Sequence, residues 1–191
     1  ILLARSGARL MSGCPISEIV EKNGVVCGVR MPGGVLAADR VSVAAGNGSS
    51  AILAGVGVQL PLLDRPGVML KTKPVAPILK HVLVAPGQEF RQLEDGAILA
   101  PTGANHQSDD AEIVAERLDQ SADIAMARLR KLIPNVDLHW ASVSLAQRPV
   151  PQDGLPVVGA CGPDGLFTSV MHSGITLAPI AAEILSREVL G

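Results

Sequence analysis

The C-terminal stretch from Arg148 to Gly191 constrains the fold of this chain more than any other part of the sequence. An Asp-Gly pair at Asp153-Gly154 favours a tight turn, and the apolar run Leu166–Val170 is typical of a short strand. Residues Leu177–Leu190 then predict a helix that closes before Gly191. A strand that passes through a glycine turn directly into a helix is a building unit of layered α/β folds.

Upstream of this stretch, short β-branched runs alternate with turn residues. Asn23-Gly24 separates two such runs, which is a strong hairpin signal. Asp109–Ile133 shows apolar residues at intervals of three or four and is the clearest helix, with Pro134 as its stop. The other predicted elements are a strand and antiparallel meander over 9–38, a buried strand at Val41–Ala45, a short helix at 49–54 capped by Ser49 or Ser50, β runs over 66–100 with a turn at Asp95-Gly96, strands at 136–145 and 166–170, and a last helix begun by Thr176 or Ser173 with Pro179 in its first turn.

This order of elements predicts two structural units. Residues 1–50 together with 148–191 form the first unit, and residues 51–147 form the second, so the chain leaves the first unit and returns to it. The predicted fold class is α/β to α+β. The first unit combines a β-meander with the C-terminal strand and helix, and the second combines a mixed β-sheet with a helix.

The sequence contains no GxGxxG between a strand and a helix, the arrangement that binds a dinucleotide pyrophosphate at a helix N-terminus. The chain also opens at Ile1 rather than at a methionine, inside what reads as the end of a helix. We therefore interpret it as the C-terminal portion of a longer protein, without the N-terminal dinucleotide-binding unit.

Charge and composition narrow the classes of function. Sixteen Lys and Arg against eighteen Asp and Glu give a net charge of −2, which offers no field for recruiting nucleic acid. Three cysteines without CxxC or metal-ligand spacing predict no metal site and favour a cytoplasmic protein. No run approaches the ~18 apolar residues of a spanning helix. The basic clusters, interpreted as solvated faces, are Lys71/Lys73 and Arg128/Arg130/Lys131.

Three segments together resemble the D-amino-acid oxidase-like family of flavoproteins, which includes glycine oxidase, sarcosine oxidase and D-amino-acid dehydrogenase. They are VSVAAGNGSS at 41–50, RPVPQDGLPVVG at 148–159 and HSGITLAP at 172–179. The resemblance is strongest over 148–179, weaker over 9–75 and topological through 80–140. It implies FAD as the cofactor of the intact protein, a partial FAD-binding domain in the first unit and a substrate-binding domain in the second.

The start of the last helix carries the first group of candidate residues. The first backbone N–H groups of a helix have no intrahelical partner, and with the helix dipole they suit an electron-rich oxygen. Gly174 would let the backbone approach a ligand closely. Most turns of this kind bind nothing, but the resemblance implies that Ser173, Gly174, Ile175 and Thr176 lie against the pyrimidine end of the flavin.

Two further residues are candidates for the reaction site. A guanidinium offers a planar bidentate fork for a carboxylate, which lysine cannot reproduce. The resemblance implies that Arg148 holds the substrate carboxylate, although the preceding LAQ departs from the family pattern and leaves the substrate open. His172 is a candidate active-site residue on the same grounds, with a structural histidine as the alternative.

The resemblance also implies contacts to the adenosine and pyrophosphate part of FAD. These involve Ala45 and Gly46, after the strand at 41–45, and the backbone of Ile16. The family has a tryptophan where this chain has Gly48, which removes bulk from the turn.

The expected function is therefore oxidation of the C–N bond of an amino or imino acid, with hydride transfer to flavin N5. The partners are the small-molecule substrate and the missing N-terminal FAD-binding segment, and a homo-oligomer is left open. We expect the isolated chain to retain little FAD and to be inactive. Two alternatives remain: a non-catalytic interaction module derived from a flavoprotein, and a flavin-dependent hydroxy-acid dehydrogenase.

Overall fold

The computed structural model describes residues 5–103 and 118–191, and the chain forms two compact units. Unit 1 comprises Ile1–Leu62 and Pro149–Gly191, and unit 2 comprises Leu63–Arg148. The first boundary lies later than the predicted residue 50, because helix α2 (Ser49–Ala54) buries Leu53 in the core of unit 1.

Unit 1 begins with the predicted antiparallel meander, formed by β1 (Glu18–Lys22), β2 (Val25–Met31) and β3 (Gly34–Ala37) in that order. Asn23 and Gly24 have φ values of 56° and 79°. Two consecutive left-handed residues are what a two-residue hairpin of type I′ requires. The Asn-Gly hairpin prediction is therefore confirmed.

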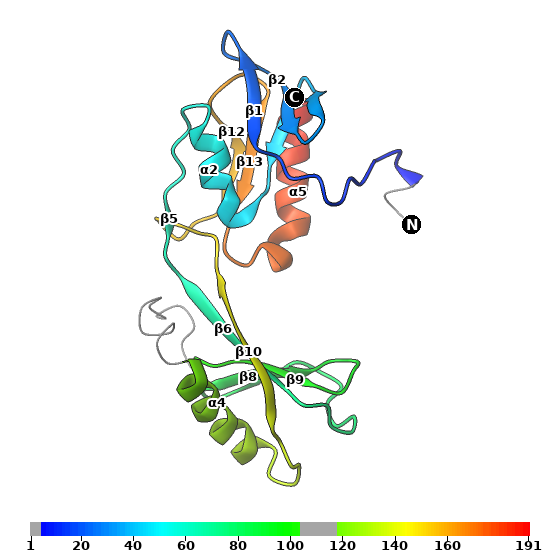
Figure 1. Ribbon diagram of the computed structural model, residues 1–191, viewed down its shortest axis with the longest axis vertical. Helices are drawn as coiled ribbons and strands as arrows, with labels where there is room; N and C mark the ends of the chain where they lie inside the picture. The colour runs from blue at the N-terminus through cyan, green and yellow to red at the C-terminus, as the bar shows by residue number, and fades with distance from the viewer. Residues whose placement is uncertain (1–4, 104–117) are drawn as a thin grey trace. The chain divides into compact units, whose positions relative to one another are not determined.

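A second sheet of unit 1 has the order β12–β13–β4, from β12 (Val157–Ala160), β13 (Leu166–Val170) and β4 (Val41–Val43). Strand β13 is antiparallel to β12 and parallel to β4. Helices α2 and α5 (Gly174–Leu190) lie on opposite sides of this sheet (Figure 1). The sequence predicted a strand at 41–45 buried on both faces, but β4 ends at Val43, and Ser42 is exposed whereas Val43 is buried.

The core of unit 1 joins the meander, the second sheet and α2. Its buried members are Ile19, Val26, Val43, Leu53 and Leu166. Burying each such side chain contributes about 1.5–3 kcal/mol. This core fixes the strand ends from which the candidate site is built.

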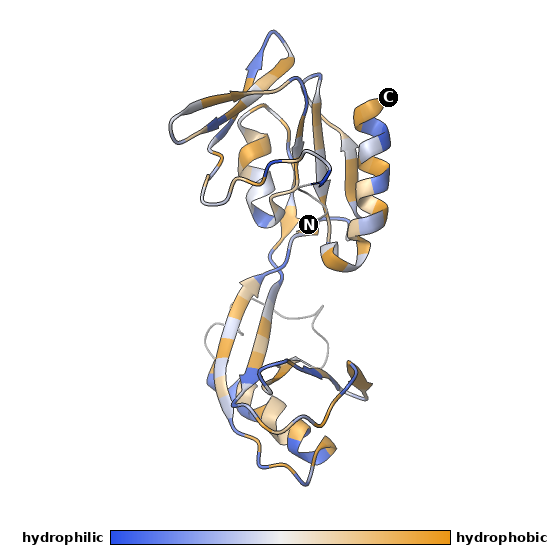
Figure 2. Ribbon diagram, turned by 90° about the vertical axis from the view of Figure 1, so that its right-hand side faces the viewer, coloured by the Kyte–Doolittle hydropathy of each residue, from blue (hydrophilic) through white to orange (hydrophobic). Residues whose placement is uncertain are grey.

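Unit 2 is a five-stranded antiparallel sheet covered by α4 (Leu118–Leu132). Its strand order is β10 (Trp140–Gln147), β6 (Pro66–Thr72), β9 (Ile98–Pro101), β8 (Gln88–Gln92) and β7 (Leu83–Ala85). Buried and part-buried residues alternate along β6, as expected for a sheet with one face against a core. Figure 2 shows the hydrophobic and hydrophilic residues along the strands and helices. Where the chain passes between the units, β5 (Leu62–Leu63) pairs with β11 (Val150–Pro151).

Helix α4 supplies Ala122, Ala125, Met126 and Leu129 to the core of unit 2. These spacings of three and four are the predicted periodicity. The predicted start of this helix, with Asp109 and Glu112, lies outside the described residues. The strand predicted at 136–145 is displaced and begins at Trp140.

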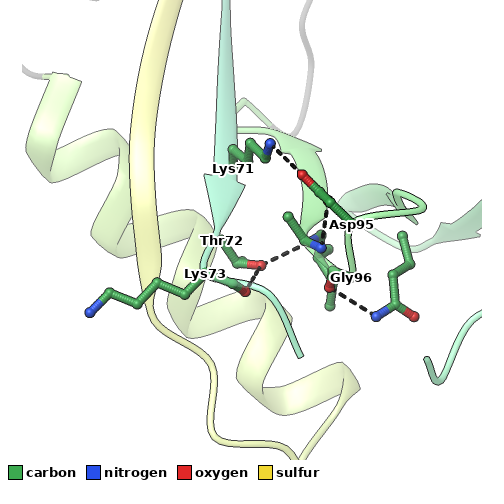
Figure 3. A network of polar contacts seen from close by, with 8 residues as sticks. Lys71, Thr72, Lys73, Asp95 and Gly96 are labelled. Carbon is green, nitrogen blue, oxygen red and sulfur yellow. Dashed lines mark hydrogen bonds and ion pairs between the residues drawn. The ribbon is translucent and has the colours of Figure 1, made fainter. Parts of the chain in front are cut away.

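The Asp95-Gly96 turn between β8 and β9 is confirmed, and a polar network surrounds it (Figure 3). Asp95 accepts hydrogen bonds from Lys71 Nζ at 2.8 Å and from the Ala97 N–H at 3.0 Å. These bonds lower the pKa of the Asp95 carboxyl below its ordinary value. Thr72 Oγ1 accepts the Ile98 N–H at 2.8 Å.

The interpretation of Arg128 as part of a solvated face is wrong. Its side chain is half-buried, and Nε donates to Gln88 Oε1 at 2.8 Å while Nη2 donates to the Thr102 carbonyl. Burial lowers the pKa of the Arg128 guanidinium. Arg128 therefore joins α4 to the ends of β8 and β9.

Candidate active site

The candidate site is built on the parallel pairing of β4 with β13. Leu166 pairs with Val41 and Thr168 with Val43, so the two strands end at the same edge of the sheet. The buried Thr168 hydroxyl donates to the Val43 carbonyl at 3.1 Å and holds this register. The segments that follow these strands, predicted to bind FAD, therefore emerge side by side.

Helix α5 begins at Gly174, earlier than the predicted 177, because Ser173 takes a left-handed conformation with φ 59° and ψ 32°. The Leu177 N–H already bonds the Ser173 carbonyl at 3.0 Å. Pro179 therefore lies inside the helix and not in its first turn. Proline lacks an N–H, so it leaves the carbonyl four residues before it without its helical donor.

No side chain caps the N-terminus of α5. Ser173 has the N-cap position, but its Oγ lies 2.9 Å from His172 Nδ1 and makes no capping bond. The N–H groups of the first helical residues, 174–176, have no partner among the residues that the structure describes. Of the two predicted helix starts, Ser173 is therefore the one found, although without a capping bond, and Thr176 lies inside the helix. Helix α2 lacks the predicted serine cap, since Gly48 is its N-cap.

A cavity of about 380 Å³ lies beside this helix start, within unit 1. It brings together Gly46, which follows β4, and Gly174. None of its lining side chains is charged; they are Ala44, Pro149, Ser169, Val170, Met171, Ala178, Ala181, Ala182 and Leu185. Gly46 has φ +57°, a conformation that other residues rarely adopt.

Glycine at 174 leaves room in front of the helix end. A Cβ built there would lie 3.9 Å from Met171 Cγ, its nearest neighbour. Ile175 is 96% exposed, which is unusual for so large an apolar side chain. The uncapped N–H groups, Gly174 and the exposed Ile175 all lie on the first turn of α5. This turn can accept a flat, partly apolar group with an electron-rich oxygen, which fits a flavin.

The other two residues predicted to contact FAD, Ala45 and Ile16, do not line the cavity. The Ala45 N–H donates to Ser49 Oγ at 3.1 Å, which shapes the turn after β4. Ile16 precedes β1 and is 36% exposed, and it does not line the cavity.

Arg148 belongs to unit 2. Its Nε donates to the Arg65 carbonyl at 3.1 Å and its Nη2 to the Pro66 carbonyl at 2.8 Å. The Arg148 Cδ also lies 3.4 Å from the position of a Cβ on Gly67. These contacts fix the plane of the guanidinium, so its direction is set before any ligand binds.

The sequence analysis named Gly174 but missed the other residues of α5 that line the cavity. Ala178, Ala181 and Leu185 follow Gly174 at intervals of three or four, the spacing of one helix face. That spacing was the available signal. Among residues 5–103 and 118–191, no group of three or more His, Cys, Asp or Glu could hold a metal ion, and no described helix is long and apolar enough to cross a membrane.

Known proteins and a protein-family profile match this chain over nearly its whole length. The profile of the FAD dependent oxidoreductase (DAO) family matches residues 2–188. A glycine oxidase of Pseudomonas putida is 31% identical over 194 residues, covering 100% of this chain and 52% of the relative. A D-amino acid dehydrogenase of Rhizobium rhizogenes is 28% identical, covering 97% of this chain and 45% of the relative. The chain thus spans about half the length of the curated relatives it matches.

Solved structures support the fold. The glycine oxidase of Geobacillus kaustophilus aligns with a TM-score of 0.73 at 22% identity, over 98% of this chain and 50% of that one. The L-amino acid deaminase of Proteus myxofaciens aligns with a TM-score of 0.78 at 16% identity, over 98% and 54%.

Proposed function

We propose, because this chain belongs to the FAD dependent oxidoreductase family, that it supplies the flavin-facing helix and the substrate-binding unit of an enzyme that oxidises the C–N bond of an amino or imino acid. The cofactor of this family is FAD. The observation that carries the proposal is the uncapped start of α5 beside the cavity that joins Gly46 to Gly174.

The residues at this helix start would hold the cofactor through their backbone. The N–H groups of Gly174, Ile175 and Thr176, with the positive end of the helix dipole, would stabilise negative charge on a ring oxygen. Flavin, when bound, supplies the acceptor for the hydride. His172, which is paired with Ser173, would orient the turn that carries these donors.

Arg148 would bind and orient the substrate carboxylate. Its guanidinium plane is held by the carbonyls of Arg65 and Pro66, which reduces the entropy lost when a carboxylate binds. Orientation is the main contribution this reaction needs from the protein, because the cofactor carries the redox chemistry.

The curated relatives are longer than the matched region, so we propose that the active enzyme also contains a dinucleotide-binding segment, on the same polypeptide or on another. Edge strand β4 supports this. It pairs in parallel with β13 on one side, and no described strand pairs with its other side. Parallel strands occur mostly in larger sheets. The same open edge supports the alternative of a non-catalytic interaction module.

The experiment compares the chain alone with the chain joined to the part of the Pseudomonas putida glycine oxidase outside the match. We expect the isolated chain to bind little FAD in equilibrium dialysis, and the joined protein to show a flavin absorption band. Stoichiometric FAD on the isolated chain would contradict the proposal. A joined protein that folds without FAD would favour the interaction module.

Arg148→Met in the flavin-loaded protein tests the substrate site. A bidentate bond to a carboxylate contributes about 1.5–3 kcal/mol, so we expect kcat/KM to fall about 10- to 100-fold. Arg148→Lys should recover only part of this loss, and Arg91→Met, on an exposed residue of β8, should have no effect. Glycine, sarcosine, D-amino acids and hydroxy acids form the panel. Turnover of hydroxy acids alone would favour the hydroxy-acid dehydrogenase.

A further inference from the structure

Arg148 lies on the side of the unit 2 sheet opposite to α4. Leu70 of β6 is buried in the core that α4 covers. Neighbouring residues of a strand face opposite sides, so Gly67 and Met69 face away from that core. The Arg148 Cδ lies 3.4 Å from the position of a Cβ on Gly67, so the arginine side chain covers this glycine. We call this side of the sheet the outer face.

The strand register places Met69 next to the arginine on the outer face. Met69 follows Gly67 by two residues, or about 6.7 Å along the strand. It pairs with Ser144 of β10 on one side and with Pro101 of β9 on the other. Ala146 pairs with Gly67. Directly paired residues share a face, so the half-buried Met69 has small or uncharged neighbours across the strands.

The cations of the outer face are already paired or lie away from Met69. Lys71, the next residue of β6 on this face, bonds Asp95 Oδ2 through Nζ at 2.8 Å (Figure 3). Arg91 lies on β8, two strands from β6, or about 9.5 Å away. Arg65 lies before β6, four residues from Met69. Among the described residues, a second substrate carboxylate would therefore find no unpaired cation beside Met69.

An acidic residue on β8 acts in the same direction. Glu89 lies two residues before Arg91 and is exposed, so it faces the same side of the sheet. Its carboxylate would repel a second carboxylate on the substrate. A short apolar side chain meets no such repulsion and gains the contact with Met69.

We propose that Met69 is a specificity-determining residue that selects substrates with a short, uncharged side chain. This inference rests on the proposed function, in which Arg148 binds the substrate carboxylate. Strand β6 begins one residue before Gly67, so the sheet surface next to the guanidinium is that of Met69. A substrate held by its carboxylate therefore extends over Met69. The thioether side chain is apolar and adapts its shape to the group that it contacts.

The first test follows the Met69 methyl group by NMR, in the full chain and in the flavin-loaded joined protein. Both are labelled with methyl-¹³C methionine, and Met69→Leu assigns the signal. Butyrate is the probe, and butan-1-ol, which lacks the carboxylate, is its control. We expect butyrate to move the Met69 signal and butan-1-ol to leave it in place. Arg148→Met should abolish the shift.

The second test measures selection in the flavin-loaded joined protein. The panel is glycine and both enantiomers of alanine, valine, glutamate and lysine. We expect higher kcat/KM for alanine and valine than for glutamate and lysine. Met69→Ala removes an apolar contact that glycine does not make, so the ratio of kcat/KM for valine to that for glycine should fall about 10-fold. Met69→Leu keeps the apolar contact and should change this ratio less than about 3-fold. Met31→Ala, at the end of β2 in unit 1, is the matched control and should leave it unchanged.

The two tests separate this inference from the proposed function. Turnover that depends on Arg148, with a valine-to-glycine ratio that Met69→Ala leaves unchanged, overturns the inference and keeps the proposed function. A wild type that prefers glutamate or lysine does the same. If turnover and the butyrate shift are both absent, the inference falls with the proposed function. Circular dichroism shows whether Met69→Ala folds, and if it does not, the butyrate shift in the wild type decides.

Discussion

Gln92, at the end of β8, holds the segment between β6 and β7 with its side-chain amide. Its Oε1 accepts the N–H groups of Ile78 at 2.8 Å and Leu79 at 3.0 Å. Its Nε2 donates to the carbonyls of Ala76 and Gly96, both at 2.9 Å, and to that of Val75 at 3.3 Å. Replacing Gln92 by Glu keeps the acceptor and turns the donor into a second acceptor, which then faces three carbonyl oxygens.

The cost can be worked out from these contacts. The four shorter hydrogen bonds, at about 0.5–1.5 kcal/mol each, would give about 2–6 kcal/mol, and water at this half-buried site lowers this to about 2–3 kcal/mol for Gln92→Leu. Gln92→Glu should cost more at pH 7, because a carboxylate facing carbonyl oxygens is repelled. That repulsion raises the pKa of the new carboxyl in the folded state. The penalty is therefore full above the folded pKa and disappears as the pH falls below the unfolded value of about 4.3.

Urea unfolding followed by tryptophan fluorescence measures this effect. Trp140 is the single tryptophan of the chain and lies in unit 2, where Nε1 donates to Asp123 Oδ1 at 3.2 Å. Gln120→Glu, on an exposed residue of α4, is the control and should change stability little. A Gln92→Glu variant within about 0.5 kcal/mol of wild type at pH 7 would refute the reasoning. A penalty that does not shrink between pH 7 and pH 4 would refute it equally.

Two further predictions concern titratable groups. The lowered pKa of Asp95 means that its bond to Lys71 adds stability at neutral pH and loses it as the pH falls through the folded pKa, below the ordinary 3.8. Asp95→Asn should therefore lower the urea midpoint at pH 7, and the difference should vanish near pH 3. Burial raises the pKa of the Cys161 thiol, whereas Cys27 is exposed, so iodoacetamide should alkylate Cys27 first, as peptide mass spectrometry can show.

Turns were predictable from the sequence because their chemistry is local. Asn23-Gly24 and Asp95-Gly96 both carry glycines with positive φ, and each closes a hairpin between neighbouring strands. The alternation of buried residues along β6 could be read in the same way, since neighbouring side chains of a strand face opposite sides.

The starts of the helices were predicted poorly because several hydrogen-bond partners compete for the side chains near a helix start. Ser173 could cap α5, but its hydroxyl instead pairs with His172. Ser49 could cap α2, but its hydroxyl accepts the N–H of Ala45. A serine near a helix start has several acceptors and donors within reach, and only the folded chain decides among them. The same holds for Arg128, whose partners lie on β8 and β9.

The candidate site combines residues that no local pattern connects. Gly46 and Gly174 line one cavity because β4 and β13 run parallel and end at the same edge. Parallel neighbours need a long connection, and here that connection includes the whole of unit 2. The sequence could suggest both glycines through family resemblance, but it contained no signal for the register that unites them. That register rests on the Thr168 hydroxyl and on the core around Leu166, so the geometry of the proposed flavin contact depends on residues that would not touch the flavin.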